Sequence, residues 1–240
     1  MTLDIITDPL LNGVSHGFFT RKGGASSGVF AGLNCGYGSS DQKDIVAINR
    51  SRVAGVLGVA PDHLVGVRQV HSADAIIVEG PTKSKPKADA LVTTRDDIAL
   101  SILTADCQPV LFADMQARVI GAAHAGWKGA LHGVLEATVA KMETLGAARR
   151  NIAAVIGPSI SQANYEVGPE FRDGFISADP SFEQFFLQGM GDRFQFDLPR
   201  FGLFQLKQSG IASASWTHQC TYDDPDRFYS YRRSVHQKQA

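Results

Sequence analysis

The stretch PVLFADMQARVIGAAHAGWKGALHGVLEATVAKMETLG, residues 109–146, contains the clearest helix pattern in the chain and two strand patterns before it. Residues 109–113 and 119–123 are continuous apolar runs, which are typical of strands covered on both faces. From residue 127 to residue 145 apolar side chains recur at helical spacing, and Gly146 provides a C-terminal stop. The stretch therefore predicts two neighbouring strands followed by a helix.

Similar patterns extend in both directions from this stretch. Short β-branched runs predict further strands at residues 65–70, 75–78, 90–94, 98–103, 152–156 and 228–233. Helical spacing predicts helices at 44–57, 169–177 and 199–208, the last two opened by a proline suited to the first turn. Together these elements predict an α/β (α+β) fold. We expect one domain, residues 1–240, built as a layered sandwich around a mixed β-sheet.

Composition limits the classes of partner. The chain of 240 residues has a net charge of −1, so it lacks the excess of lysine and arginine that binds nucleic-acid phosphates. No apolar run reaches the length of a membrane span, and no basic segment precedes the first apolar residues as in a signal peptide. The three cysteines fit neither a disulfide framework nor a zinc knuckle. We therefore expect a cytoplasmic protein that binds small molecules, with neither nucleic acid nor a membrane as partner.

Cys107, His71 and His124 each lie at or near the end of a predicted strand. Strand ends of a mixed sheet can meet in one cleft, and two imidazoles with one thiolate suit zinc while leaving a fourth position for water or substrate. Each residue also has an ordinary structural interpretation, and separations of 36 and 17 residues match no short metal motif. A third interpretation pairs Cys107 with His124 in a metal-free cysteine hydrolase.

Groups near these three residues could hold an anion or move a proton. Gly126 precedes a predicted helix start, whose backbone N–H groups and dipole favour an anion such as phosphate. Asp106, beside the thiol, could exchange protons, although a hydrogen bond to a backbone N–H or an arginine is the favoured interpretation. Arginine can bind an anion bidentately, while a surface salt bridge is the expected role of each one taken alone. The candidates are Arg21, Arg50, Arg232 and Arg233.

Longer motifs run along the chain in a fixed order. They are T-R-x-G-G-x-S-x-G at 20–28, L-N-x-G at 33–36, N-R at 49–50, Q-V-H at 69–71, T-A-D-C-x-P-V at 104–110, A-A-H-A-G-W-K-G at 122–129, G-P-x-I at 157–160, Y-E-V-G at 165–168, C-T-Y at 220–222 and F-Y-S-Y-R-R at 228–233. With these motifs the sequence resembles, along nearly its whole length, the YfiH-like family, also called the laccase-domain or polyphenol oxidase family.

The resemblance implies a metal centre and an activity. The family's metal ligands fall on His71, Cys107 and His124, which would hold Zn²⁺, with copper able to replace it. The implied enzyme is a purine nucleoside phosphorylase acting on adenosine, inosine, guanosine or methylthioadenosine, with inorganic phosphate as co-substrate and adenosine deaminase as an additional activity. Catalytic residues would be Cys107, His124, His71 and Asp106, and substrate-binding residues would be Arg21, Asn34, Arg50, Gly126, Lys128 and Arg232.

Two features depart from the family pattern. Lys128 stands where arginine is common, so an anion there would meet a point charge instead of a bidentate group. The sequence stops at SVHQKQA, before the family's last apolar strand, which predicts an exposed sheet edge.

The laccase description can be compared with the histidine content. A multicopper oxidase needs copper sites bound mainly by HxH motifs, and this chain has seven histidines and no HxH. We therefore expect any copper-dependent polyphenol oxidase activity to come from adventitious copper. Phosphorolysis ranks first, the cysteine hydrolase acting on amide or cell-wall precursor bonds second, and a binding module without turnover last. The sequence predicts neither the preferred nucleoside nor the oligomeric state.

Overall fold

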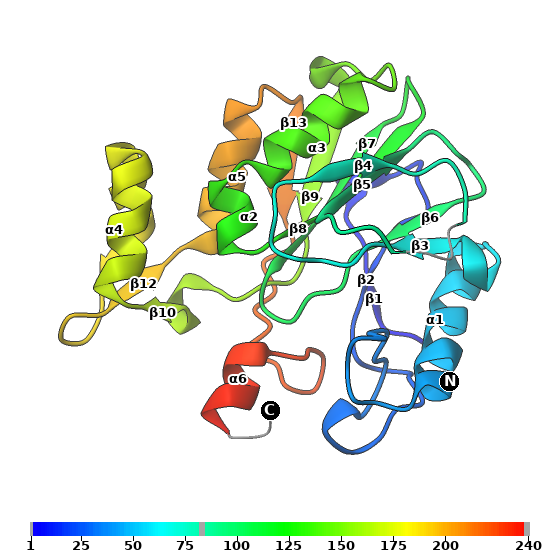
Figure 1. The fold of residues 1–240 in the computed structure, drawn as a ribbon, viewed down its shortest axis with the longest axis horizontal. Helices are drawn as coiled ribbons and strands as arrows, with labels where there is room; N and C mark the ends of the chain where they lie inside the picture. The colour runs from blue at the N-terminus through cyan, green and yellow to red at the C-terminus, as the bar shows by residue number, and fades with distance from the viewer. Residues whose placement is uncertain (1, 82–84, 238–240) are drawn as a thin grey trace.

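The computed structural model describes residues 2–81 and 85–237, and a six-stranded sheet lies at its centre (Figure 1). The strand order is β13 (Ser213–Trp216), β9 (Ile152–Ile156), β7 (Gln108–Asp114), β8 (Val119–Ala125), β5 (Ala90–Thr93) and β4 (Ala75–Ile77). β13 runs parallel to β9 and β4 runs parallel to β5, while the other neighbours are antiparallel. The predicted mixed sheet is confirmed.

The hairpin β7–β8 is the pair predicted from residues 109–123. Asp114 accepts hydrogen bonds from the backbone N–H groups of Gln116 and Ala117, at 2.9 and 3.0 Å, and so stabilises the turn. The register pairs Pro109 with His124 and Gln108 with Ala125. Residues just before β7 therefore lie beside residues at the end of β8.

Helices cover one face of the sheet (Figure 1). They are α2 (Trp127–Leu131), α3 (Val134–Glu143) and α5 (Leu198–Gln208), whose apolar side chains share the main core with those of the strands. The helix predicted over 127–145 is interrupted, because Gly133 adopts a left-handed conformation with φ of 90° between α2 and α3. The apolar spacing continues across that break, so the sequence pattern did not reveal it.

Shorter elements lie outside the main sheet. They are α1 (Lys43–Leu57), the parallel pair β3 (Leu64–Gly66) and β6 (Ala99–Ser101), and the antiparallel pair β1 (Ile5–Ile6) and β2 (Phe18–Phe19). The strands predicted at 65–70 and 98–103 thus exist only in part and lie outside the main sheet. A three-stranded sheet of β10 (Glu166–Val167), β12 (Phe194–Phe196) and β11 (Phe186–Gln188) accompanies α4 (Pro169–Ala178). Short 3₁₀ helices span Pro9–Leu11, Gly28–Phe30, Pro61–His63, Arg149–Asn151, Gln162–Asn164 and Pro180–Phe185.

The prediction of a strand at residues 228–233 was wrong. Residues 228–230 have no regular structure and helix α6 (Tyr231–His236) follows them. Ser230 caps this helix, because its hydroxyl accepts a hydrogen bond from the backbone N–H of Arg233. The alternating aromatic pattern resembled a strand, but the serine cap begins a helix instead.

The helices of the described residues are short or carry polar side chains. None of their helices combines the length and the apolar content needed to cross a bilayer.

Candidate metal centre

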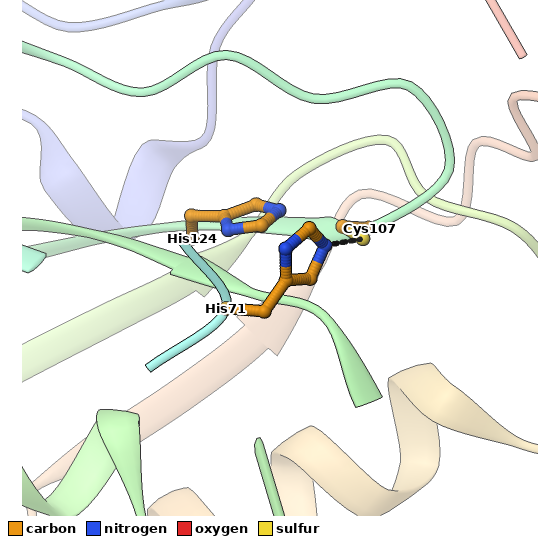
Figure 2. Close-up of side chains that lie close together, drawn as sticks. All are labelled: His71, Cys107 and His124. Atoms are coloured by element: carbon orange, nitrogen blue, oxygen red, sulfur yellow. Dashed lines mark hydrogen bonds between the residues drawn. The ribbon is translucent and has the colours of Figure 1, made fainter. Parts of the chain in front are cut away.

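The fold brings His71, Cys107 and His124 together (Figure 2). Their ligand atoms all lie within 4.8 Å of one another, and Cys107 Sγ is 3.9 Å from His71 Nε2. His71 is exposed in a loop, Cys107 directly precedes β7, and His124 is buried near the end of β8. The β7–β8 register accounts for the approach of Cys107 to His124, because it places the residue before β7 opposite Gly126.

Gly126 leaves space for the side chains of Cys107 and His71. A Cβ atom added there would lie 2.9 Å from Cys107 Sγ and 2.9 Å from His71 Cδ2. The backbone of Gly126 has φ of −66° and ψ of 166°, which any residue can adopt. The glycine is therefore required by the close contact with the ligands and not by backbone conformation.

Asp89 contacts both histidines of the candidate site and was missed by the sequence analysis. Its carboxylate is fully buried and lies 2.8 Å from His124 Nδ1, and it accepts hydrogen bonds from the backbone N–H groups of residues 70–72. Burial opposes the charge, but the bonds from His124, Ser72 and Val70 outweigh it and hold the pKa of Asp89 well below its usual range. An aspartate inside the apolar run KADALV was the available signal, since a buried carboxylate needs several donors.

Asp106 anchors the cysteine loop to the C-terminal segment. Its carboxylate accepts hydrogen bonds from the Thr221 hydroxyl (2.7 Å), the Ser230 hydroxyl (3.0 Å) and the Arg232 backbone N–H (2.7 Å). Asp106 has φ of 92°, a conformation that costs a non-glycine residue about 1–3 kcal/mol and persists only where neighbours hold it. The sequence analysis favoured a hydrogen bond from a backbone N–H to the Asp106 carboxylate, and the bond from the Arg232 N–H agrees with that interpretation. Both oxygens are engaged, which favours anchoring over proton transfer.

Gln69 joins the loops that carry His71 and Cys107. Its side-chain amide donates to the carbonyl oxygen of Leu103 at 2.7 Å and its side-chain oxygen accepts from the Leu103 N–H at 2.9 Å. This pair of bonds imitates one rung of a β-ladder. The sequence analysis quoted Gln69 within a motif but gave it no role.

The protonation of the thiol bears on the hydrolase interpretation. Burial, together with the negative charges of Asp106 and Asp89, raises the pKa of Cys107 to about 12. Burial and the neighbouring His124 lower the pKa of His71. A cysteine nucleophile must react as the thiolate, and the raised pKa of Cys107 keeps its thiol protonated, so these surroundings disfavour the hydrolase.

The donor set fits a transition metal such as zinc. Bonds of about 2.1 Å to nitrogen and 2.3 Å to sulfur place two tetrahedral zinc ligands about 3.6 Å apart, close to the 3.9 Å between Cys107 Sγ and His71 Nε2. Asp89 occupies Nδ1 of His124, which leaves Nε2 for the metal. Three protein ligands leave a fourth position open, as in catalytic zinc sites.

The other predicted substrate-binding residues fall into two groups. Lys128 and Arg232 lie near the metal centre, since the charge of Lys128 lowers the pKa of His71 and the backbone of Arg232 bonds Asp106. Arg21, Asn34 and Arg50 instead line a cavity of about 1150 Å³, whose wall includes none of the three ligands. Their side chains already bond other groups of the protein: Arg21 to Ala31 and Pro225, Asn34 to Ser39 and Asp41, and Arg50 to Leu64. Their role in substrate binding stays a prediction.

Arg233, the remaining candidate for anion binding, is also engaged. Its guanidinium donates to the carbonyl oxygens of Thr221, Tyr222 and Phe228. These bonds fix the segment before α6, so Arg233 has a structural role here.

The fold and the centre define a class of protein: a mixed-sheet α/β protein with a three-ligand site for a transition metal. A family profile described as a multi-copper polyphenol oxidoreductase laccase matches residues 15–239. The chain belongs to this family, the YfiH-like family, as its sequence motifs predicted.

Relatives and solved structures agree with the family assignment. Proteins named purine nucleoside phosphorylase from Deinococcus radiodurans and Corynebacterium glutamicum are each 39% identical to this chain. The matches cover 93% of this chain and 85% of the first relative, and 94% of this chain and 92% of the second. The crystal structure of the Neisseria meningitidis protein NMB0706 is similar, with a TM-score of 0.88, 33% identity, and coverage of 96% of this chain and 93% of that one. The crystal structure of Bacillus licheniformis YfiH has a TM-score of 0.85 and 30% identity, covering 91% and 87%.

Proposed function

We propose that this chain is a zinc-dependent purine nucleoside phosphorylase. It transfers the ribosyl group of a purine nucleoside to inorganic phosphate, which gives the free base and ribose 1-phosphate. The observation that carries the proposal is the close grouping of His71, Cys107 and His124. Three protein ligands would leave a fourth position of a tetrahedral metal for water or a reactant. The names of the relatives support the choice of reaction.

The bound metal supplies a Lewis acid that polarises an oxygen of the reactants. The surrounding chain orients those reactants. Val70 and Leu103 adjoin the ligand loops and remain 42% and 38% exposed, so they offer apolar surface to a flat purine base. Gln69 fixes these two side chains relative to each other, because it bonds the backbone of Leu103. Holding both reactants at one site supplies proximity.

Phosphate is held mainly by side-chain charge in this proposal. Helix α2 contains five residues, so its dipole is weaker than the sequence pattern of one long helix suggested. Lys128 is exposed beside Trp127, with Nζ 5.3 Å from the ring centroid, and Arg232 lies over Tyr165, with Cζ 5.3 Å from that ring. Arg232 uses one nitrogen to donate to the Glu166 carbonyl oxygen, so its guanidinium keeps further donors for phosphate.

The decisive experiment measures hypoxanthine release from inosine with and without phosphate. We expect release by the zinc-loaded protein to require phosphate and to yield ribose 1-phosphate in equal amount. His132→Ala is a matched control, since His132 is exposed at the end of α2 and belongs to no ligand group. Release that does not depend on phosphate would exclude phosphorolysis.

Adenosine deamination is a secondary activity in this proposal. It requires a group that moves protons between water and the purine ring. Asp106 is the sequence candidate, but its carboxylate already accepts three hydrogen bonds. We therefore expect deamination to be slower than phosphorolysis and to survive Asp106→Asn in a protein that remains folded, as measured by ammonia release.

Phenol oxidation requires copper in place of zinc. The described residues contain one group of three possible metal ligands, which is too few for a multicopper cluster. Oxidase activity is expected to follow copper content and to disappear in copper-free, zinc-loaded protein. Persistence of the activity in such a preparation would contradict this expectation.

A further inference from the structure

We propose that Asp89 is the positioning residue that fixes both histidine ligands and thereby sets how tightly the chain holds its metal. This inference rests on the proposed function, since that function requires a metal at His71, Cys107 and His124. It concerns the construction of the site, so it can be tested without any nucleoside.

One carboxylate connects the two histidine-bearing segments. Oδ1 of Asp89 lies 2.8 Å from His124 Nδ1 and accepts from the backbone N–H of His71 at 3.0 Å. Oδ2 accepts from the Val70 N–H at 3.1 Å, the Ser72 N–H at 2.6 Å and the Ser72 hydroxyl at 2.9 Å. Asp89 itself is 0% exposed, so water does not compete for these bonds. Five donors thus converge on a group with about four lone-pair sites.

The contact with His124 selects the form of its ring. A carboxylate only accepts hydrogen bonds, so Nδ1 of His124 must carry the proton. Nε2 then keeps its lone pair for the metal. Without an acceptor at Nδ1, the proton could occupy Nε2, and that form of the ring cannot bind a metal through Nε2.

The contacts with residues 70–72 hold the His71 loop in place. His71 has φ of 60°, which is uncommon for a residue with a side chain. Three successive N–H groups point to the same carboxylate, an arrangement that forms around an anion. Removing the negative charge therefore releases the loop that presents His71, while the strand that carries His124 stays paired with β7 and β5.

The main test compares zinc binding by Asp89→Asn and by wild-type protein. Asparagine has the same size, but its amide nitrogen is a donor and must face either His124 or the N–H groups of residues 70–72. We expect about 10- to 100-fold weaker zinc binding in competition with a chromophoric chelator. Asp74→Asn is the matched control, because it removes the same charge from an exposed position later in the His71 loop and should bind zinc as the wild type does. Equal zinc affinity in Asp89→Asn and Asp74→Asn would overturn the proposal.

A spectroscopic measurement separates positioning from a loss of fold. In cobalt-substituted protein, we expect Asp89→Asn to weaken the visible bands of a tetrahedral site while far-ultraviolet circular dichroism is unchanged. Unaltered cobalt bands in a folded variant would contradict the proposal.

Two further measurements apply if Asp89→Asn does not fold. Nitrogen NMR of metal-free wild-type protein should show His124 protonated at Nδ1, and protonation at Nε2 would overturn the proposal. Ser72→Ala removes one of the five hydrogen bonds, so zinc binding should weaken severalfold, and unchanged affinity would overturn it as well. None of these results depends on nucleoside turnover, so failure of phosphorolysis leaves them interpretable.

Discussion

The substitution Gly126→Ala tests whether the three side chains meet around one ion. The added methyl would lie 2.9 Å from both Cys107 Sγ and His71 Cδ2, which is about 0.6–1.1 Å closer than the optimal separation of non-bonded atoms. Metal–ligand distances tolerate changes of only about 0.2 Å. The methyl must therefore displace at least one ligand by more than the coordination shell accepts.

The size of the effect follows from the cost of overpacking. One extra methyl in a closely packed site costs about 1–3 kcal/mol. If that cost falls on the metal-bound state, zinc affinity falls about 5- to 140-fold, because 1.4 kcal/mol corresponds to a factor of ten. Backbone strain contributes little, since Gly126 already has φ of −66°.

The assay is a zinc titration against a competing chelator, with metal content measured after dialysis. Gly55→Ala in α1 is the control, because an added Cβ there meets no atom within 4 Å. It should leave zinc affinity unchanged and raise the free energy of unfolding by about 0.5–1 kcal/mol. Wild-type zinc affinity in Gly126→Ala would refute the reasoning, since the methyl would then fit without moving a ligand.

Three further predictions follow from the same structure. Cys107→Ser should lower zinc affinity and the rate of phosphorolysis by at least about 100-fold, because a hydroxyl replaces the thiolate ligand. The circular dichroism spectrum should be unchanged. A normal zinc content in this variant would contradict the prediction. Arg232→Gln should raise the KM for phosphate about tenfold without changing the zinc content, since a charge-assisted hydrogen bond to phosphate is lost. An unchanged KM would exclude Arg232 from phosphate binding. Burial opposes ionisation of Asp114, but hydrogen bonds from the N–H groups of Ala117, Ala148 and Gln116 outweigh burial and lower the pKa of Asp114. The ionised carboxylate therefore stabilises the folded state at pH values above the pKa of Asp114 in the unfolded chain. That stabilisation is lost as the pH falls through the lower pKa of Asp114 in the folded protein. Asp114→Asn should therefore lower the free energy of unfolding by about 1–3 kcal/mol at pH 7, and the difference should shrink below about pH 4 in urea unfolding; a difference independent of pH would refute the assignment.

Most regular elements could be predicted from local patterns. The β7–β8 hairpin and helices α1, α4 and α5 follow runs whose apolar spacing matches one structure only. The error at residues 228–233 came from a contact that no local pattern contains. Ser230 both caps α6 and donates to Asp106, which lies 124 residues earlier in the chain.

The candidate site, like the fold, could be predicted from the sequence only in part. Cys107 and His124 were predicted to meet because strand ends in one sheet converge, and the hairpin register brings them together. Arg21 and Arg50 had the right chemistry for an anion, but their donors bond backbone carbonyl oxygens and they line a separate cavity. Residue type indicates what a side chain can bind, whereas packing decides what it contacts.

The sequence by itself determined the ligand types and the positions of the main strands along the chain, because both depend on residue identity and on short-range periodicity. Only the tertiary structure decided that Asp89 would hold His71 and His124 together, and that Gly126 would leave room for Cys107 and His71. The physical reason is that a buried carboxylate takes its donors from wherever the packed chain brings N–H groups close. That closeness depends on how strands and loops far apart in sequence fold against one another.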